Sequence, residues 1–442
     1  MTAEKIKVAP GAELSVIPTD KFKSNYIALN FYFPLKKERA SRVSLLSRVM
    51  TRGTMKYPTI GELNRYTDML YEMTFSMSVS GFGGIQVLCF RMDYLGDRFI
   101  PEGESFNITD LALDFMKEFI LRPLVKDGEF LSEYVEAEKK LLTDRIRSEI
   151  NNKDAYAMKR ARGHFLGDHP AAIPSYGELE TVAPINGAEL YGELLAVLRE
   201  ARVEALFVGD TSGGVVDKLV MALGEILPAD RIDAKTPVIP KPDYDALGTD
   251  VRRVTEEADA RQGRMILGYS LPYDTCESVI ASTFLEIFSG SPVSRLFMNV
   301  REKLNLCYYC SAAIDASVYS MTIRSGIAEE NVEKAMAEIE RQLKDIVAGN
   351  ISENELELAK NAIISSMKGL KDSGSSLGEW YLRRMVLGLP TDIDGMIERT
   401  ANVTVSEVAE FASRAKLRMK YFLRGVSEEI QDPDESDESE DD

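Results

Sequence analysis

The chain has 442 residues, of which 45% are hydrophobic and 28% charged, and its net charge is −18. This length and composition are typical of a globular protein with two to four domains. The acidic charge argues against nucleic-acid binding, because contacts to phosphates require a basic surface. No apolar run reaches the roughly 18 residues of a membrane-spanning helix. The charged N-terminus does not resemble a signal peptide, so we expect a cytoplasmic protein without membrane contact.

The negative charge is concentrated at the C-terminus. Residues 428–442 contain ten acidic and no basic side chains, so they carry −10 and the rest of the chain −8. A segment that repels itself and has almost nothing to bury cannot form a core. We therefore predict a disordered acidic tail over residues 428–442.

Strand and helix patterns alternate in the first half of the chain. Strand-like runs at 14–18 and 26–34 flank a polar turn, which predicts an antiparallel pair. Runs at 73–79 and 84–92, joined by a glycine-rich turn, predict a β-hairpin. Hydrophobic periodicity also predicts further elements. These are helices at 43–50, 60–70, 110–121, 129–151 and 215–226 and a strand at 203–210.

The pattern then begins again after a proline-rich stretch without apolar periodicity, residues 228–250, which predicts a linker. The strand-like run 27–35 has a counterpart 238 residues later, at 265–273, and each run leads into an apolar helix. This repeat indicates two homologous halves, residues 1–227 and 251–427. Neither half shows regular β-α-β alternation, so we predict an α+β fold with mostly antiparallel sheets packed against helices.

The helix predicted at 43–50 has a polar face made of Ser44, Ser47 and Arg48. These residues stand at positions i, i+3 and i+4, so their side chains share one side of the helix. Zinc peptidases of the inverted type place His, Glu and His at these offsets, to bind zinc and to deprotonate its water. Serine is a poor zinc ligand and a guanidinium repels the cation, so we predict no metal. Without further context, the segment is an ordinary amphipathic helix ending at Gly53.

Two further patterns contain metal-binding or redox-active residue types. His164 and His169 have no Cys, Glu or third His at a suitable offset, and the stretch between them indicates a helix end, so we predict structural roles. Cys307 and Cys310 form a C-x-x-C pattern in a β-prone run. Residues three apart in a strand point to opposite faces, so we predict no redox role.

Several motifs together resemble a known family. They are the helix of Ser44 with Arg52-Gly53-Thr54 at its end, Tyr57-Pro58, Leu70-Tyr71, the helix of Glu138, His169-Pro170 before Gly177, Ser294-Arg295-Leu296-Phe297 and Val300-Arg301-Glu302-Lys303. With the duplication, they resemble the insulinase/pitrilysin family of zinc peptidases over about residues 10–425, in its mitochondrial-processing-peptidase-like branch. The chain is similar to the non-catalytic member of a bacterial gene pair associated with 5-aminopentanol modification of elongation factor P or with bacteriocin maturation.

The resemblance implies that the zinc site has been lost. The two zinc-binding histidines of the family would fall on Ser44 and Arg48, and the general-base glutamate on Ser47. The third ligand, a glutamate on a later helix, would fall near Arg145. Glu138, which resembles a carboxylate that supports the site in active members, remains. The resemblance thus implies no metal, no cofactor and no peptidase activity of the chain alone.

The second half retains what the resemblance identifies as a substrate-binding pair, Arg301 and Tyr308. In active members an Arg and a Tyr seven residues apart bind the substrate carbonyl or the developing oxyanion, and both side chains can donate hydrogen bonds to it. The alternative is that Arg301 pairs with Glu302 or another surface carboxylate and that Tyr308 fills a strand face.

Three functions remain open from the sequence. The first is an inactive subunit that pairs with an active zinc-peptidase homologue, or with a second copy of itself, and helps to form a chamber for a peptide or protein substrate. The second is a scaffold that holds a peptide or protein without cleaving it. The third is an autonomous peptidase with other metal ligands, which we do not favour.

Overall fold

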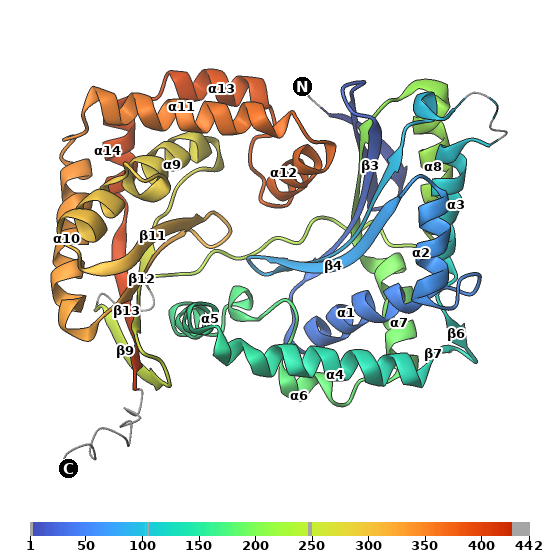
Figure 1. Ribbon diagram of the computed structural model, residues 1–442, viewed down its shortest axis with the longest axis horizontal. Coiled ribbons are helices and arrows are strands. Elements are labelled where there is room, and N and C mark those ends of the chain that lie inside the picture. The colour runs from blue at the N-terminus through green and yellow to red at the C-terminus, as the bar shows by residue number, and fades with distance from the viewer. Residues whose placement is uncertain (1–2, 102, 104–105, 246–249, 427–442) are drawn as a thin grey trace, which may run out of the picture.

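The computed structural model describes residues 3–101, 103, 106–245 and 250–426, and it contains two β-sheets that face each other across the molecule (Figure 1). Helices pack against both sheets. The architecture confirms the predicted α+β fold with sheets that are mostly antiparallel. The predicted acidic tail, residues 428–442, lies outside the described residues.

The first sheet has six strands in the order β1-β2-β8-β3-β5-β4. Neighbouring strands are antiparallel, except that β2 and β8 run parallel. The central strand β3 is almost entirely buried, which explains its nearly continuous apolar sequence. The strands are β1 (Glu4–Ala9), β2 (Ala12–Pro18), β3 (Ser24–Pro34), β4 (Thr74–Phe82), β5 (Ile85–Leu95) and β8 (Arg202–Gly209).

The second sheet has five strands in the order β11-β12-β10-β13-β9. Here too one pair, β13 and β9, is parallel and the other pairs are antiparallel. A separate two-stranded ribbon joins β6 (Val125–Lys126) to β7 (Glu129–Phe130). The strands of the second sheet are β9 (Arg252–Ala258), β10 (Gly263–Ser270), β11 (Cys307–Asp315), β12 (Ser320–Ile327) and β13 (Lys416–Gly425).

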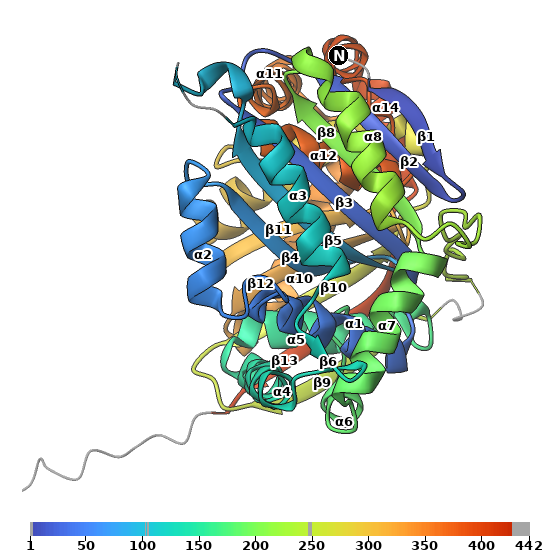
Figure 2. The same ribbon diagram turned by 90° about the vertical axis from the view of Figure 1, so that its right-hand side faces the viewer.

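Helices α3 and α8 cover the outer face of the first sheet (Figure 2). The helices of the first half are α1 (Lys37–Val49), α2 (Ile60–Met69), α3 (Ile108–Leu121), α4 (Ser132–Ser148), α5 (Lys153–Leu166), α6 (Leu179–Val182), α7 (Gly187–Glu200) and α8 (Val215–Ile226). Those of the second half are α9 (Ser278–Leu285), α10 (Val332–Val347), α11 (Glu353–Leu370), α12 (Gly374–Val386), α13 (Ile393–Ala401) and α14 (Val405–Ser413).

Of the two strand pairings predicted in the first half, one is confirmed and the other is wrong. The hairpin predicted around the glycine-rich turn is confirmed as β4 and β5, which pair from Thr74 and Asp93 to Phe82 and Ile85. The predicted antiparallel pairing of 14–18 with 26–34 is wrong, because β8 lies between β2 and β3 and bonds to both. Strand β8 comes from far along the chain, so a local pattern cannot reveal its position.

One helix of each half packs on the sheet of the other half. Helix α5 packs on β10 and β13 of the second sheet, where Phe165 contacts Gly268 and Tyr421 lies in the same apolar cluster. Helix α12 packs on β8 and β3 of the first sheet, where Gly378 abuts Tyr26. Figure 1 shows both helices between the two sheets. This reciprocal packing produces two apolar clusters to which both halves contribute residues.

A polar contact anchors α5 to the second sheet. The Glu256 carboxylate on β9 accepts hydrogen bonds from Arg160 Nε at 2.9 Å and Nη2 at 2.6 Å, from His164 Nε2 at 2.8 Å and from the Tyr421 hydroxyl at 2.9 Å. Arg160, followed by His164 and Tyr421, holds the pKa of Glu256 down at about 2. The ionised carboxylate is therefore the form that the folded protein favours.

This contact predicts an acid-sensitive attachment of α5. A depressed pKa gives stability that is fully present above about pH 4.5 and is lost as the pH falls towards 2. We expect Glu256→Gln to remove about 1–2 kcal/mol of this pH-dependent stability. This figure is smaller than the full pKa shift implies, because Arg160 is half exposed and water screens its charge. Denaturant unfolding between pH 7 and 3 measures how the free energy of unfolding changes with pH in the wild type and in the variant. Glu257→Gln, on the same strand but in an exposed pair with Arg424, should keep the wild-type pH dependence.

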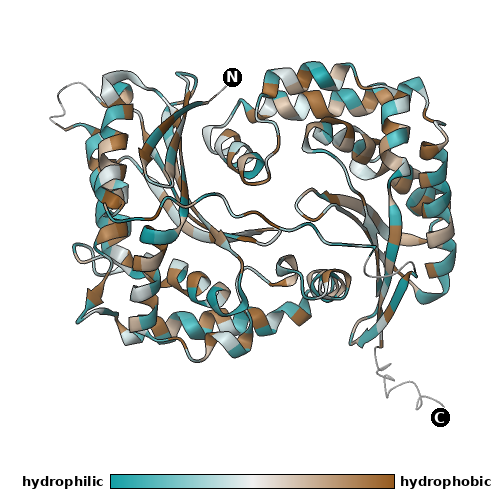
Figure 3. Ribbon diagram, turned by 180° about the vertical axis from the view of Figure 1, so that it is seen from behind, coloured by the Kyte–Doolittle hydropathy of each residue, from teal (hydrophilic) through white to brown (hydrophobic). Residues whose placement is uncertain are grey.

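The helices of both halves have mixed surfaces. Hydrophobic and hydrophilic residues alternate along the helices of both halves (Figure 3). Within the described ranges, no helix is both long enough and apolar enough to cross a membrane.

Candidate functional site

Helix α1 carries the polar face that the sequence singles out. Val43, Leu45 and Leu46 are fully buried in the core of the first half and fix the orientation of the helix. Ser44 and Ser47 are also buried, at 4% and 5% exposure. The Ser47 hydroxyl donates to the Ser44 carbonyl at 2.8 Å. This hydroxyl is therefore used within the helix itself.

The next polar residues of the segment bind a carboxylate from helix α4. Glu138 is buried, with 8% of its side chain exposed, and it lies between two guanidiniums. Arg52 donates from Nε to Oε1 at 2.7 Å, and Arg48 approaches Oε2 with Nη1 at 3.5 Å. One negative and two positive charges therefore share a site that is mostly removed from water.

This arrangement is the opposite of a metal site. A divalent cation would meet two permanent positive charges and could gain only hydroxyl ligands and a carboxylate that is already paired. Across the described part of the chain, no group of three or more His, Cys, Asp and Glu side chains could hold a metal ion. The two guanidiniums supply the positive charge that balances the buried Glu138 carboxylate.

Arg145, where the resemblance would place the third ligand, makes its contacts with a different residue. Its guanidinium lies 5.6 Å from the centre of the Tyr176 ring, and Lys159 lies 5.5 Å from the same ring. Both contacts are cation–π interactions. The sequence patterns did not connect Arg52 with Arg48, although the two residues stand at positions i and i+4 and could have been recognised as one charged face.

Arg301 and Tyr308 lie at the edge of the second sheet. Arg301, in the π-helical segment Leu296–Lys303, has 40% of its side chain exposed. Its guanidinium lies 3.5 Å from Glu302 and stacks at 4.6 Å on the ring of Phe297. Tyr308 on β11 is 75% exposed. The structure thus shows the Glu302 pair that the sequence left open, whereas Tyr308 does not fill a buried strand face.

The exposure of Tyr308 results from a β-bulge. Cys307 pairs with Ile327 and Tyr309 with Gly326, so Tyr308 is an extra residue without a partner on β12. The expectation that Cys307 and Cys310 point to opposite faces is wrong, because the bulge shifts the alternation and both thiols lie in the same core. A hydrogen bond with Cys310 lowers the pKa of the Cys307 thiol, and the Arg301 guanidinium acts in the same direction.

The two histidines make contacts within the protein. His164 binds Glu256, as described above, and His169 Nε2 lies 2.7 Å from the Pro240 carbonyl oxygen. The backbone N–H of Ala171 donates to His169 Nδ1 at 3.1 Å. The His164 contact ties α5 to the second half, and the His169 contact ties the following turn to the stretch 228–250, so both contacts are of the structural kind that the sequence predicts.

Comparisons with known proteins agree with this picture. Residues 195–363 match the family described as "Peptidase M16 inactive domain". The "Probable inactive metalloprotease YmfF" of Bacillus subtilis is 25% identical over 426 residues, which are 94% of this chain and 96% of the relative. An "Uncharacterized zinc protease", ML0855 of Mycobacterium leprae, is 22% identical over 69% of this chain and 67% of its own length.

Solved structures share the whole architecture. A conserved protein from Enterococcus faecalis superposes with a TM-score of 0.86 at 27% identity and covers 97% of this chain and 100% of its own. A peptidase M16 inactive domain from Pseudomonas fluorescens has a TM-score of 0.77 at 16% identity, with the same coverage of both chains. The second likeness concerns the fold alone, because its sequence identity is low.

Proposed function

We propose that this chain, which the comparisons support as an inactive member of the insulinase family, is the non-catalytic subunit of a two-chain zinc peptidase. Its partner would be an active homologue that carries the zinc. In this proposal, the chain contributes Arg301, Tyr308 and free strand edges to a shared peptide-binding chamber. The finer resemblance adds a place in the mitochondrial-processing-peptidase-like branch and an association with elongation factor P modification.

This proposal rests on one observation. Arg48, at a position where the resemblance would place a zinc ligand, is paired and mostly buried, whereas Arg301 and Tyr308 are exposed. Of the residues at which the resemblance would place the zinc site, Arg48 pairs with Glu138, together with Arg52, in a mostly buried cluster. Arg301 and Tyr308, in contrast, are exposed, and the carboxylate that pairs with Arg301 within the described residues is that of its neighbour Glu302. An exposed pair between neighbouring residues contributes about 0–1 kcal/mol, so a substrate oxyanion could replace it at little cost.

Strand edges add a way to hold an extended substrate. Strands β4 and β11 are the outermost strands at one end of the first and of the second sheet. An edge strand offers unpaired backbone N–H and C=O groups, to which a peptide can add as a further strand. The bulge at Tyr308 interrupts regular pairing on β11 and presents its phenol to the outside.

The proposal predicts that Arg301→Ala lowers the activity of the mixed complex but not the assembly. Loss of one donor to an oxyanion typically reduces kcat by about 100-fold or more. The measurement is peptide cleavage by the active homologue with wild-type or Arg301→Ala chain, with complex formation checked by gel filtration. Arg65→Ala, which removes an exposed arginine on α2, is the matched control and should leave cleavage unchanged.

The result also separates the two remaining functions. If the homologue cleaves equally well with wild-type and Arg301→Ala chain, the shared-site proposal is wrong. A non-proteolytic scaffold would bind a peptide or protein client and leave the cleavage rate of any homologue unchanged. An autonomous peptidase would cleave peptides as the pure chain.

A further inference from the structure

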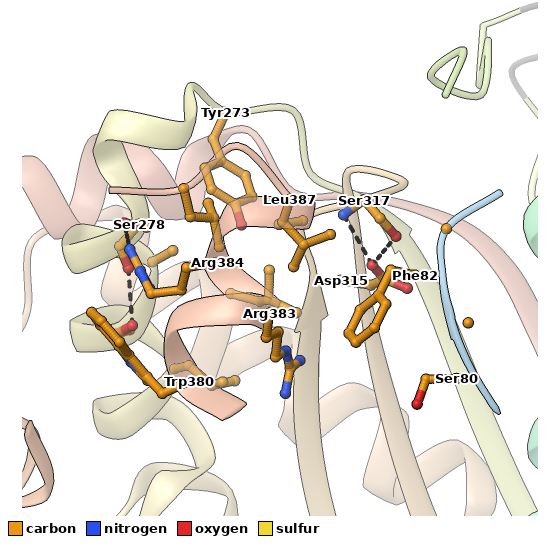
Figure 4. A pocket seen from close by; sticks show the side chains of 18 residues that line it. Ser80, Phe82, Tyr273, Ser278, Asp315, Ser317, Trp380, Arg383, Arg384 and Leu387 are labelled. Atoms are coloured by element: carbon orange, nitrogen blue, oxygen red, sulfur yellow. Dashed lines mark hydrogen bonds between the residues drawn. The ribbon is translucent and has the colours of Figure 1, made fainter. Parts of the chain in front are cut away.

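A cavity of about 670 Å³ lies between the two halves (Figure 4). Neither Arg301 nor Tyr308 is among the residues that line it. The turn between β4 and β5 forms one wall, and the turn between β11 and β12 approaches it, with Gly83 against Ser317. Helices α9 and α12 of the second half form the remaining walls. The cavity thus exists in a single chain and needs no partner.

Arg384 on α12 is a partly buried cation whose partners among the described residues are neutral groups. It donates from Nη2 to the Ser278 hydroxyl at 3.0 Å and from Nε to the Pro390 carbonyl, and it stacks at 5.0 Å on the Trp380 ring. No carboxylate of the described residues pairs with it. Burial lowers the pKa of Arg384 to about 10, and the neighbouring Arg383 contributes to the shift. A desolvated guanidinium without a counter-ion gains strongly from an anion.

Arg383 adds a second positive charge to the same wall. Figure 4 shows its side chain between Trp380 and Phe82, and within the described residues it forms no ion pair. The acidic side chain of the cavity, Asp315, is already engaged, since it lies 3.2 Å from Arg162 Nη1 and accepts from the Ser317 backbone N–H at 3.0 Å. The lining therefore has an unbalanced positive charge, although the whole chain is acidic.

We propose that this cavity binds a ligand with one carboxylate on an apolar body, and specifically the C-terminal end of a peptide. The exposed guanidinium of Arg383 would receive the terminal carboxylate, which Arg can bind with two parallel hydrogen bonds. Arg384, whose side chain turns to Ser278 in Figure 4, would add positive charge to the same wall. Apolar side chains of the lining, among them Tyr273, Trp380 and Leu387, would receive the last side chain of the peptide.

Two features favour a carboxylate over a phosphate. Both arginines stand in the last turn of α12, where the negative end of the helix dipole offsets part of their charge. Asp315 on the opposite wall would repel a doubly charged group more strongly than a singly charged one. Asp315 could also accept a hydrogen bond from a peptide N–H, which a phosphate ion cannot offer.

This inference goes beyond the proposed function, because it needs neither the active partner nor Arg301. Trp380 is the only tryptophan of the chain and lines the cavity, so its fluorescence reports occupancy directly. The probes are a short N-acetylated peptide that ends in leucine and the same peptide with a C-terminal amide. We expect the acid to change the Trp380 emission saturably and to bind at least about tenfold more tightly than the amide.

Variants of the chain test whether the arginines cause the difference in affinity between the peptide acid and the peptide amide. Arg383→Gln, an exposed position without partners, should weaken binding of the acid about tenfold and leave binding of the amide unchanged. Arg65→Gln is the matched control and should change neither, and circular dichroism should show that both variants fold. Equal binding of acid and amide, no response of Trp380 to either peptide, an unaffected Arg383→Gln, or tighter binding of inorganic phosphate than of the peptide would overturn the proposal.

Discussion

Replacing Glu138 with alanine is expected to destabilise the protein by about 2–3 kcal/mol, because the change leaves Arg48 and Arg52 close together and unpaired. Removal of one partner from a fully buried ion pair costs about 3–5 kcal/mol. The two guanidiniums remain about a quarter exposed, so water screens part of their charge and we expect the smaller cost of about 2–3 kcal/mol. Denaturant unfolding at pH 7 measures the change directly.

A control on the same helix makes this prediction specific. Glu136 is 63% exposed, and among the residues that the structure describes it pairs only with Lys139, three residues later. Glu136→Ala should therefore cost less than about 0.5 kcal/mol. If Glu138→Ala were as harmless as Glu136→Ala, the cluster of Arg48, Arg52 and Glu138 would not stabilise the fold as we describe.

The second large effect is expected at Gly378, where α12 meets the first sheet. A Cβ atom at this position would lie 2.4 Å from Cε1 and 2.8 Å from Cδ1 of Tyr26, whose side chain is only 1% exposed. The buried ring has little room to move, so Gly378→Ala must displace α12. Overpacking of this kind costs about 1–3 kcal/mol.

Gly369 near the end of α11 is the matched control for this substitution. No atom lies within 4 Å of the position that its Cβ would take. Gly369→Ala should therefore leave stability unchanged or raise it by up to about 1 kcal/mol, because alanine favours a helix more than glycine. Thermal unfolding of both variants should show shifts of opposite direction or clearly different size. Equal shifts would contradict a close helix–sheet contact at Gly378.

Local sequence patterns predicted the elements that depend on neighbouring residues. The glycine-rich turn of the β4–β5 hairpin and the repeat of strand β3 in β10 were both visible, since each depends on periodicity within a short window. The position of β8 between β2 and β3 was not, because its pairing joins residues that are far apart in the chain. The exchange of α5 and α12 between the halves escaped prediction for the same reason.

The candidate site shows the same limit at the level of single residues. Spacing placed Ser44, Ser47 and Arg48 on one face of a helix, and chemistry excluded zinc there. Spacing could not reveal that Arg52 and Glu138 meet, because Glu138 comes from another helix. The bulge at Tyr308 also escaped prediction, since one extra residue reverses which side chains share a face.

The most direct test of the account is the zinc content of the purified chain. After equilibration with zinc and removal of excess metal, mass spectrometry of the wild type should show far less than stoichiometric zinc, and peptide cleavage by the chain alone should be absent. Stoichiometric zinc in the wild type that is lost in Glu138→Gln would contradict the account, because it would place a metal where the structure has two guanidiniums.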